Sequence, residues 1–322
     1  MRRFGCLGLV AALVLIGTAF WAIHDWRGAG PAAKDITIVV APGSSLAKAA
    51  ERLEAAGAIR SARRFTLFAK FLGSGAGIKA GEYRILAHVS QARILQLLQT
   101  GKTMQRLVTI PEGMPSIMAQ ERITAAPELT GSIGRPEEGS LLPDSYSYES
   151  GATRRSIVDR MQRAMTAYLA KAWAARDPGL AVKTPEEALI LASIVEKETA
   201  KASERTTVAA VYSNRLKQGI PLGADPTTIY PITLGKPLGR RILRSELEAK
   251  NDWNTYKMTG LPKTPIANPG RASIDAVLHP AHSAALYFVA DGTGGHVFAN
   301  TYEQHQANVA KWYAIRRARG EM

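Results

Sequence analysis

The chain has 322 residues and a hydrophobic fraction of 46%, which allow two or three folded domains and exclude wholesale disorder. Its formal net charge of +14 favours anionic partners such as lipid headgroups, nucleic acid or an acidic polymer. The single cysteine, Cys6, excludes an intramolecular disulfide and a zinc site built from cysteines.

The N-terminus carries an apolar segment. Phe4–Ile23 has no charged residue over 20 positions, which is long enough to cross a bilayer as a helix. Arg2 and Arg3 precede it, so we predict a single-pass span of the cytoplasmic (inner) membrane, with the N-terminus in the cytoplasm and the rest extracytoplasmic, or periplasmic where there is an outer membrane. The alternative is a cleaved signal peptide, but the bulky Phe20 and Trp21 leave no small-residue cleavage motif, and we favour an uncleaved anchor.

A weak internal repeat follows the apolar segment. Ile36–Val40 is a β-branched run, followed by a Pro-Gly turn and a helical pattern over 44–56. Arg106–Ile110 begins a second such series, with a helical pattern over 116–123. Both copies predict a strand, a tight turn and a helix.

The segment between the two copies is also patterned. Residues 61–72 have a helical pattern in which Phe65, Phe68 and Phe71 recur every three residues, and we expect these rings to face the core. Gly81–Ile85 is predicted to be a strand, and 92–98 a helix that ends at a glycine.

From about residue 135 the composition changes. Glycine, proline and groups that hydrogen-bond sugars punctuate a predicted loop at 138–146. A long polar stretch at 221–270 shows little periodicity, which is typical of functional loops. The remaining predicted elements are an amphipathic helix at 156–176, a helix at 203–216 capped by Ser203, a hairpin of 286–289 with 296–299, and a basic helix at 302–319.

The strongest helix signals surround the sequence ASIVEKET at 192–199. Thr184 is a good N-cap, Pro185 fits the first helical position, and Glu187 completes a T-x-x-E capping box. No glycine or proline interrupts 186–199. We therefore predict one continuous helix that ends near two glutamates.

The helical period places the two glutamates on different faces of the predicted helix. At about 100° per residue, Leu191, Ile194 and Val195 share one face, Glu198 lies near its centre, and Glu196 lies roughly 150° away. An apolar face disfavours the charged form of a carboxyl, which makes Glu198 the candidate general acid. The alternative is that Glu198 is paired with a buried Arg or Lys.

Other chemistries lack their motifs. The sequence contains no GxSxG, P-loop, HExxH or GxGxxG pattern, and no pattern of a nucleic-acid-binding module. His279 and His282 have metal-ligand spacing, but Pro280 lies between them and no third ligand is evident. His296 is expected to be a strand residue with a satisfied side chain. We predict no metal, no cofactor and no nucleic-acid partner.

Several stretches, in order, resemble the MltG/YceG family of membrane-bound endolytic murein transglycosylases. They cover nearly all of 138–309 and read GSLLPDSYSY, LASIVEKETA, SERTTVAAVYSNRLKQGIPLGADPTTIY, NTYKMTGLPKTPIANPG, SIDAVLHPA and LYFVADGTGGHVFANTYEQH. The chain departs from the usual pattern at Gly223-Ala224, where Gln-Thr is common, and at Pro231, where Gly is common. These differences affect a loop near the expected cleft and spare the acid.

The resemblance implies an α+β fold with an N-terminal transmembrane helix, LysM-like βα modules, and a mixed α/β catalytic domain with a lysozyme-like catalytic helix. The expected domains are an anchor and linker at 1–30, a LysM-like module at 31–105, a second LysM-like segment at 106–135 and the catalytic domain at 136–322.

The implied activity is a lyase reaction that cuts the MurNAc-β-1,4-GlcNAc bond of nascent peptidoglycan strands, leaves 1,6-anhydroMurNAc ends and terminates elongation. Implied partners are glycan strands, the cytoplasmic membrane and cell-wall synthases. The alternatives are a non-catalytic peptidoglycan-binding scaffold for those synthases and a muramidase that uses water.

The resemblance also assigns residues. Glu198 is the catalytic acid, and Glu196 supports it or is itself the acid. Each candidate substrate-binding side chain has the alternative of bracing its own loop. These candidates are Tyr146, Asn214, Asp225, Thr227, Tyr230, Asn254, Tyr256 and Asn268.

Overall fold

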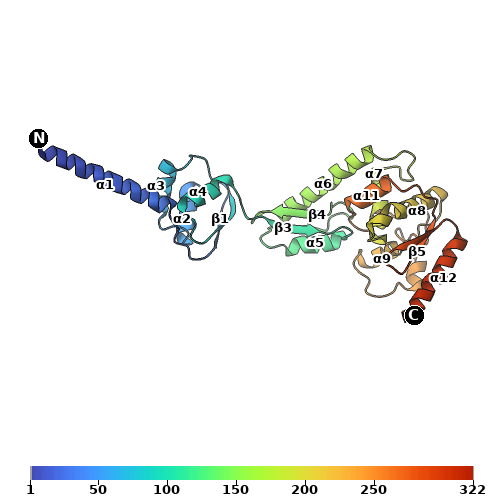
Figure 1. Cartoon of the computed structure of the whole chain (residues 1–322). Helices are drawn as coiled ribbons and strands as arrows, with labels where there is room; N and C mark the ends of the chain where they lie inside the picture. Colours follow the sequence, from blue (N-terminus) through green and yellow to red (C-terminus); the bar gives the residue numbers. More distant parts are fainter. Residues whose placement is uncertain (1, 322) are drawn as a thin grey trace. The chain divides into compact units, whose positions relative to one another are not determined.

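The structure is a computed structural model that describes residues 2–321, with side chains from residue 12 onward. It is a mixed α+β protein, as expected, and it divides into two compact units (Figure 1). The first unit is Met1–Arg106 with Ser147–Gly151, and the second is Leu107–Tyr146 with Ala152–Met322.

The first unit packs three short helices and a two-stranded sheet around the end of a long N-terminal helix. Its elements are α1 (Arg2–Arg27), β1 (Ile36–Val40), α2 (Leu46–Ala55), α3 (Ala62–Leu72), β2 (Gly81–Ile85) and α4 (Gln91–Thr100). The strands are antiparallel, with Ile38 opposite Tyr83. Serine side chains cap α2, α3 and α4, which explains why these helices begin where the sequence predicts.

The prediction for one core residue of this unit, Phe71, is wrong. Phe65 and Phe68 are buried, but Phe71 is 73% exposed. A spacing of three residues turns about 300° rather than 360°, so each phenylalanine falls about 60° behind the previous one. Phe71 is therefore about 120° away from Phe65 and leaves the buried face.

The predicted membrane span lies partly outside the described residues. Phe4–Ile23 falls on α1, but the side chains of residues 1–11 are not among those described, and these include Arg2, Arg3 and Cys6. Within the described part of the chain, no helix has both the length and the apolar character needed to cross a bilayer.

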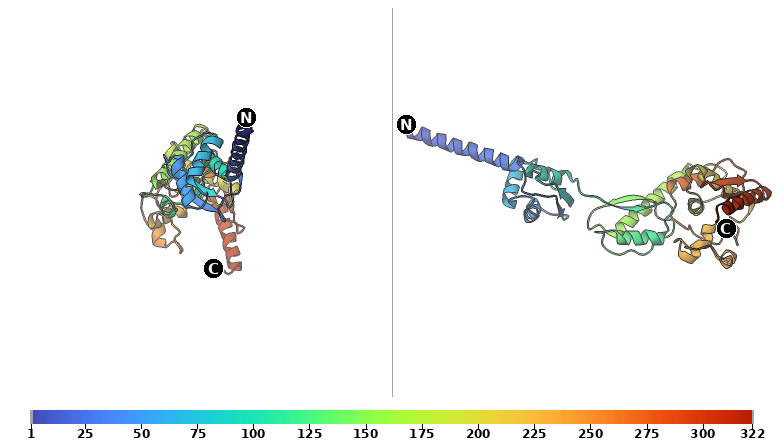
Figure 2. Two further views of the ribbon diagram at one scale, coloured as in Figure 1. Left: turned by 90° about the vertical axis from the view of Figure 1, so that its left-hand side faces the viewer. Right: turned by 60° about the horizontal axis from the view of Figure 1, so that its bottom comes forward.

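The second unit contains the remaining elements, except that Arg106 of β3 and the last residues of β4, Ser147 and Tyr148, fall in the first unit (Figures 1 and 2). They are β3 (Arg106–Ile110), α5 (Ser116–Ala125), β4 (Asp144–Tyr148), α6 (Arg154–Ala174), α7 (Pro185–Glu198), a 3-10 turn (Ala202–Glu204), α8 (Arg205–Gln218), α9 (Asp225–Thr233), α10 (Arg244–Glu248), α11 (Arg271–Leu278), β5 (Tyr287–Ala290), β6 (His296–Ala299) and α12 (Tyr302–Ala318). Strands β3 and β4 pair with each other, and β5 and β6 form an antiparallel hairpin.

Helix α7 lies at the centre of the core of this unit. It packs against α8, α9 and α11, and its Leu191, Ile194 and Val195 are fully buried. Burying a side chain of this kind contributes roughly 1.5–3 kcal/mol. This packing fixes the helix that carries both glutamates.

Three local expectations differ from the structure. The stretch 221–270 contains α9, which carries two prolines, and α10, which has only five residues, so neither shows a 3.6-residue period. Part of the expected loop at 138–146 belongs to β4. Ser203 lies inside the 3-10 turn and does not cap α8, whose N-cap residue Glu204 makes no side-chain capping bond.

Candidate active site

Helix α7 begins and ends as its sequence dictates. The Thr184 hydroxyl accepts a hydrogen bond from the Glu187 amide at 3.2 Å, and Pro185 occupies the first turn. The Glu187 carboxylate accepts from the Lys183 amide rather than from Thr184, so the expected capping box is only half formed. The helix ends at Glu198, and Thr199 is extended.

Glu198 lines a cavity of about 710 Å³ that is formed by several parts of the second unit. Helices α7 and α8, the segment 220–225, the β5 strand and α12 all line it. The lining side chains that carry a charge, a hydroxyl or an aromatic ring are Glu198, Tyr212, Arg215, Asp225, Tyr256, Tyr287, Phe288, His305, Trp312, Tyr313 and Arg316.

Burial makes Glu198 a weaker acid than an exposed glutamate. Its Oε1 atom is buried and has no hydrogen-bond partner among the described residues. Desolvation raises the pKa of the carboxyl to about 7; the Tyr212 hydroxyl and the Arg215 charge oppose this rise, and the Asp225 carboxylate adds to it. At neutral pH a substantial fraction of Glu198 therefore keeps its proton.

Glu196 has a different environment. Its Oε2 atom accepts hydrogen bonds from the Gly270 amide at 2.9 Å and from the Ser273 hydroxyl at 2.7 Å. Both donors belong to the start of α11, where a helix N-terminus favours a negative charge. Glu196 is thus a structural acceptor that joins α7 to α11, and it is not among the residues that line the cavity.

A second carboxylate shares the cavity with Glu198. The Tyr256 hydroxyl donates a 2.7 Å hydrogen bond to Asp225, at the first residue of α9. Burial, followed by this bond, raises the pKa of Tyr256, so the phenol stays protonated and keeps donating. The bond fixes a negative charge close enough to Glu198 to affect its ionisation.

Arg215 holds three parts of the cavity wall together. Its Nε donates to the Leu286 carbonyl at 2.6 Å, and its Nη1 donates to the carbonyls of Pro221 and Leu222 at 3.3 and 2.6 Å. The guanidinium also lies over the Tyr287 ring, 5.1 Å from its centroid. Because several of its donors are engaged, Arg215 is a fixed positive charge beside the acid.

Asp225 and Tyr256 are therefore the predicted substrate-binding residues that the structure brings to Glu198. The other six lie away from the lining, and their polar atoms bond the protein itself. Tyr146 donates to the Leu142 carbonyl, Thr227 bonds Ala224 and Thr255, and Tyr230 donates to Glu138.

The three asparagines brace backbone. Asn214 donates to the carbonyls of Ser283 and Ala285. Asn268 is fully buried; it accepts from the Leu141 amide and donates to the Met114 carbonyl. Asn254 is equally buried, and its amide group donates to three carbonyls, those of Glu246, Leu247 and Ala249.

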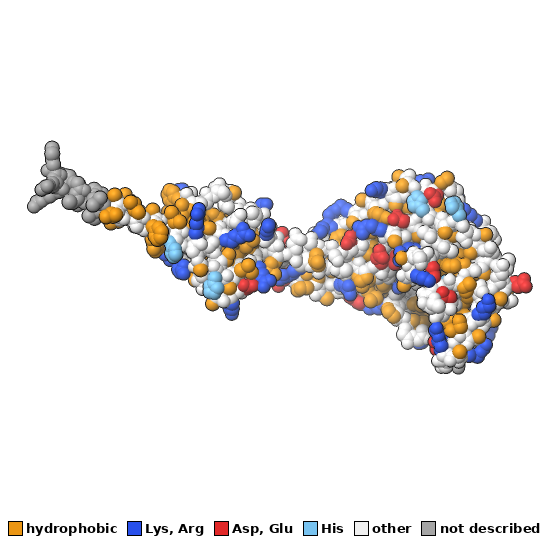
Figure 3. Space-filling view, in the orientation of Figure 1, with side chains coloured by type: hydrophobic (Ala, Val, Ile, Leu, Met, Phe, Trp, Pro, Cys, Tyr) orange, Lys and Arg blue, Asp and Glu red, His pale blue; other side chains and the backbone are white. Residues whose placement is uncertain are grey.

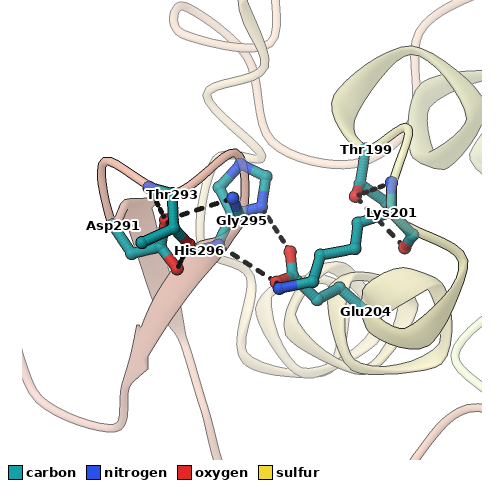
Figure 4. Close-up of polar contacts among 7 residues, drawn as sticks. All are labelled: Thr199, Lys201, Glu204, Asp291, Thr293, Gly295 and His296. Atoms are coloured by element: carbon teal, nitrogen blue, oxygen red, sulfur yellow. Dashed lines mark hydrogen bonds and ion pairs between the residues drawn. The ribbon is translucent and has the colours of Figure 1, made fainter.

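Just after Glu198 the chain is tied to the β5–β6 hairpin (Figure 4). The Lys201 ammonium and Glu204 form a 2.9 Å ion pair. Glu204 accepts a hydrogen bond from the His296 amide at 3.1 Å and bonds the ring Nδ1 at 2.7 Å. His296 is thus a satisfied strand residue, as predicted.

A glycine lies against this cluster. A Cβ at Gly295 would lie 2.4 Å from Glu204 Oε1 and 2.6 Å from Lys201 Nζ, so a side chain there would have to displace the ends of these two side chains. Asp291 accepts from the amides of Thr293 and Gly295 and so closes the hairpin turn. Strand β5, the first strand of this hairpin, lines the cavity with Phe288 and the residues on either side of it.

Several lining residues were not predicted from the sequence. Tyr212 and Arg215 lie three residues apart, a spacing that places them on the same side of α8. That spacing within YSNRLKQG is a signal that would have found them. The contribution of α12 had no such signal, because its Trp312 and Arg316 reach the cavity only through tertiary packing on β5.

The histidine pair 279 and 282 does not belong to this cavity. His279 Nδ1 lies 2.8 Å from the Asp177 carboxylate, on the surface. Within the described part of the chain, no cluster of three His, Cys, Asp or Glu side chains has the geometry to hold a metal ion.

The sequence pattern of the YceG-like family matches residues 38–311. The chain belongs to the YceG-like family. A crystal structure of a YceG-like protein from Listeria monocytogenes has a TM-score of 0.54 at 27% identity, over 85% of this chain and 98% of that one. The family to which the motifs pointed is therefore confirmed.

Two relatives of this YceG-like chain carry the name endolytic murein transglycosylase. The one from Bacillus subtilis strain 168 is 28% identical over 93% of this chain and 91% of its own length. The one from Streptococcus pneumoniae is 30% identical over 86% of this chain, which spans 58% of that relative.

Replacing Glu204 by Gln should destabilise the hairpin in a pH-dependent way. Burial opposes ionisation of Glu204, but the hydrogen bonds from His296 and Lys201 outweigh it and hold its pKa below the ordinary value of 4.5. A lowered pKa gives stability that is present above pH 4.5 and is lost as the pH falls further. Urea unfolding should show the largest wild-type advantage near neutral pH, shrinking below pH 4.5; an advantage independent of pH would contradict this role.

Replacing Asn254 by Ala should affect stability rather than substrate recognition. The change removes the side-chain donor of the Leu247 and Ala249 carbonyls and the acceptor of the buried Thr228 hydroxyl, and a buried unsatisfied polar group costs about 1–3 kcal/mol. We expect a lower midpoint in urea. The matched comparison is Tyr256→Phe, which removes one hydroxyl from the cavity and should lower turnover with less effect on that midpoint. The reverse pattern would assign Asn254 to the substrate.

Proposed function

We propose that this chain is an endolytic murein transglycosylase, a lyase that cuts the MurNAc-β-1,4-GlcNAc bond within nascent glycan strands and leaves 1,6-anhydroMurNAc ends. Relatives with that name match most of the chain. The observation that carries the proposal is the Glu198 carboxyl, which lines a large cavity and has a pKa of about 7.

One carboxyl is sufficient for this reaction. Protonated Glu198 donates its proton to the glycosidic oxygen as the bond to C1 of MurNAc breaks. The oxocarbenium-like centre is stabilised by the cavity and by the substrate's own N-acetyl group. The Glu198 carboxylate then removes the proton of the MurNAc 6-hydroxyl, whose oxygen attacks C1. The enzyme returns to its protonated state, and no water is consumed.

The neighbours of Glu198 suit both halves of this cycle. Burial and the Asp225 charge favour the protonated acid that starts the reaction. The Tyr212 hydroxyl and the Arg215 charge favour the carboxylate that forms in the middle. These opposing influences hold the pKa near the working pH, where an acid that must also act as a base is most effective.

We also propose the expected placement and domain roles. The anchor Phe4–Ile23 would hold the chain in the cytoplasmic membrane, with residues 136–322 as the catalytic domain on the periplasmic side. Residues 31–105 and 106–135 would act as LysM-like modules that contact glycan. Such a tether would keep the enzyme near the cell-wall synthases from which nascent strands emerge, where a cut terminates elongation. The uncharged span and its preceding arginines support this.

Replacing Glu198 by Gln should remove the anhydro-ended products while leaving the fold intact. An amide has no proton to donate, and loss of a general acid lowers a rate by about 10²–10⁴-fold. The measurement is mass spectrometry of purified glycan strands after digestion, with circular dichroism as the check on folding. A fully active Glu198→Gln enzyme would refute the assignment.

The matched control is Glu196→Gln, the same change two residues earlier on the same helix. It weakens the hydrogen bonds to Gly270 and Ser273 and should lower stability while retaining the chemistry. If only Glu196→Gln lost activity, Glu196 would be the catalytic acid and Glu198 the structural residue. Products that are heavier by one water identify a muramidase, and sacculus binding without new ends identifies a scaffold.

The rate should fall as the pH rises above about 7. The acid must be protonated to act, so its pKa of about 7 sets the start of the alkaline decline. Asp225→Asn removes a negative charge that raises this pKa, so the decline should move to lower pH. Initial rates of anhydro-end formation between pH 5 and 9 provide the measurement. An unshifted profile in Asp225→Asn would exclude electrostatic coupling between the two carboxyls.

A further inference from the structure

The first unit leaves large apolar side chains exposed where α1 meets α3, and Figure 3 shows hydrophobic atoms gathered at this junction. On α3, Leu67, Phe71 and Leu72 are 51%, 73% and 44% exposed. On α1, Phe20 and Trp21 are 73% and 51% exposed. Such a group differs from single exposed apolar residues, which are common, and it marks an interaction surface.

Ring contacts fix the direction of α3 along α1. The Trp26 ring lies 5.7 Å from Phe65 and 6.1 Å from Phe68, and the Trp21 ring lies 6.3 Å from Phe68. As α3 advances, its contacts therefore move to earlier residues of α1. Phe71 lies one turn beyond Phe68, so α3 carries it further along α1, towards the N-terminal apolar part of that helix.

Basic residues accompany these apolar side chains. Arg63 and Lys70 lie on the same side of α3 as Leu67, and together they line a hollow with Glu51 and Glu54 of α2. Helix α3 itself contains no acidic residue. Residues 12–106 contain 13 Lys or Arg and 5 Asp or Glu, a net charge of +8, so the surroundings of the patch attract anions.

We propose that an anionic lipid bilayer covers this surface, so that the first unit rests on the headgroup region beside the anchor. The inference depends on the anchor assigned under the proposed function. The surface, called here the α1–α3 surface, consists of Phe20, Trp21, Leu67, Phe71 and Leu72, with Arg63 and Lys70 at its edge.

A bilayer fits this surface better than a protein partner does. The apolar side chains continue along α1 into Leu13–Ile16, which are 58–68% exposed, so one hydrophobic phase can cover both. A helix with aromatic and aliphatic side chains between Lys and Arg is typical of the membrane interface. Trp21 has the amphipathic ring that prefers this depth.

The test places an environment-sensitive fluorophore at single cysteines in the full chain. The lone Cys6 is replaced by Ala, and Phe71→Cys, Val39→Cys and Leu13→Cys are labelled with a nitrobenzoxadiazole group. The proteins are reconstituted into phosphatidylcholine vesicles with and without phosphatidylglycerol, carrying nitroxide quenchers at shallow or deep positions. Val39 is the matched control because it is 42% exposed but lies on β1, on the side of the first unit away from α1 (Figure 1).

The expected result is severalfold stronger quenching by shallow nitroxides at position 71 than at 39, and quenching by deep nitroxides at 13. Removing phosphatidylglycerol, or introducing Arg63→Gln with Lys70→Gln, should reduce the quenching at 71. Equal responses at 71 and 39 would overturn the proposal. Protection at 71 from aqueous iodide without lipid quenching would indicate a second copy or another protein, and would also overturn it.

The outcomes separate this proposal from the ones on which it depends. Absence of quenching at 13 would reject the anchor and the α1–α3 surface together. Quenching at 13 without quenching at 71 would reject the surface alone. Anhydro-end formation is assayed in the same samples and in the wild-type chain, and its absence from both would count against the enzymatic function without affecting the lipid result.

Discussion

The second unit is organised around a carboxyl whose ionisation is opposed by burial. Glu198 is the last residue of α7, where the carbonyl ends of the helix disfavour a negative charge, and its Oε1 atom is buried without a partner. Two residues earlier, Glu196 meets the opposite field at the start of α11. One short sequence thus places chemically identical groups in contrasting environments, one suited to proton transfer and the other to holding two helices together.

Holding this carboxyl in place requires the surrounding loops to be rigid. Arg215 joins the 220–225 segment to the start of β5, and Glu204 joins the chain after α7 to the turn end of the same hairpin. Buried asparagines bind carbonyls of segments that form no long helix or strand. Because the polar groups of these loops are satisfied by fixed side chains, the cavity keeps its shape without substrate and its charges stay where the reaction needs them.

The sequence predicted the parts of this arrangement that depend on local physics. Helix α7 and the phase of its two glutamates follow from capping residues and a 3.6-residue period. The roles of Asn214, Asn254 and Asn268 depend on which distant carbonyls they meet, and no pattern along the chain contains that information. Helices α9 and α10 were missed because they are held by such contacts. Phe71 was misassigned because a three-residue spacing drifts away from the core face, and that drift produces the exposed α1–α3 surface.

The choice between the anhydro product and hydrolysis depends on how the cavity treats water. The MurNAc 6-hydroxyl is part of the substrate, and a well-oriented internal nucleophile reaches an effective concentration of about 10⁵–10⁸ M, far above that of liquid water. Glu198 needs only to remove one proton from it. The Tyr256 hydroxyl donates to Asp225 Oδ1 and so competes with water for this second carboxylate. The aromatic walls contributed by Tyr287 and Trp312 further limit hydration. A single enclosed acid therefore favours closure of the sugar onto itself, and a second catalytic carboxylate would serve the competing reaction.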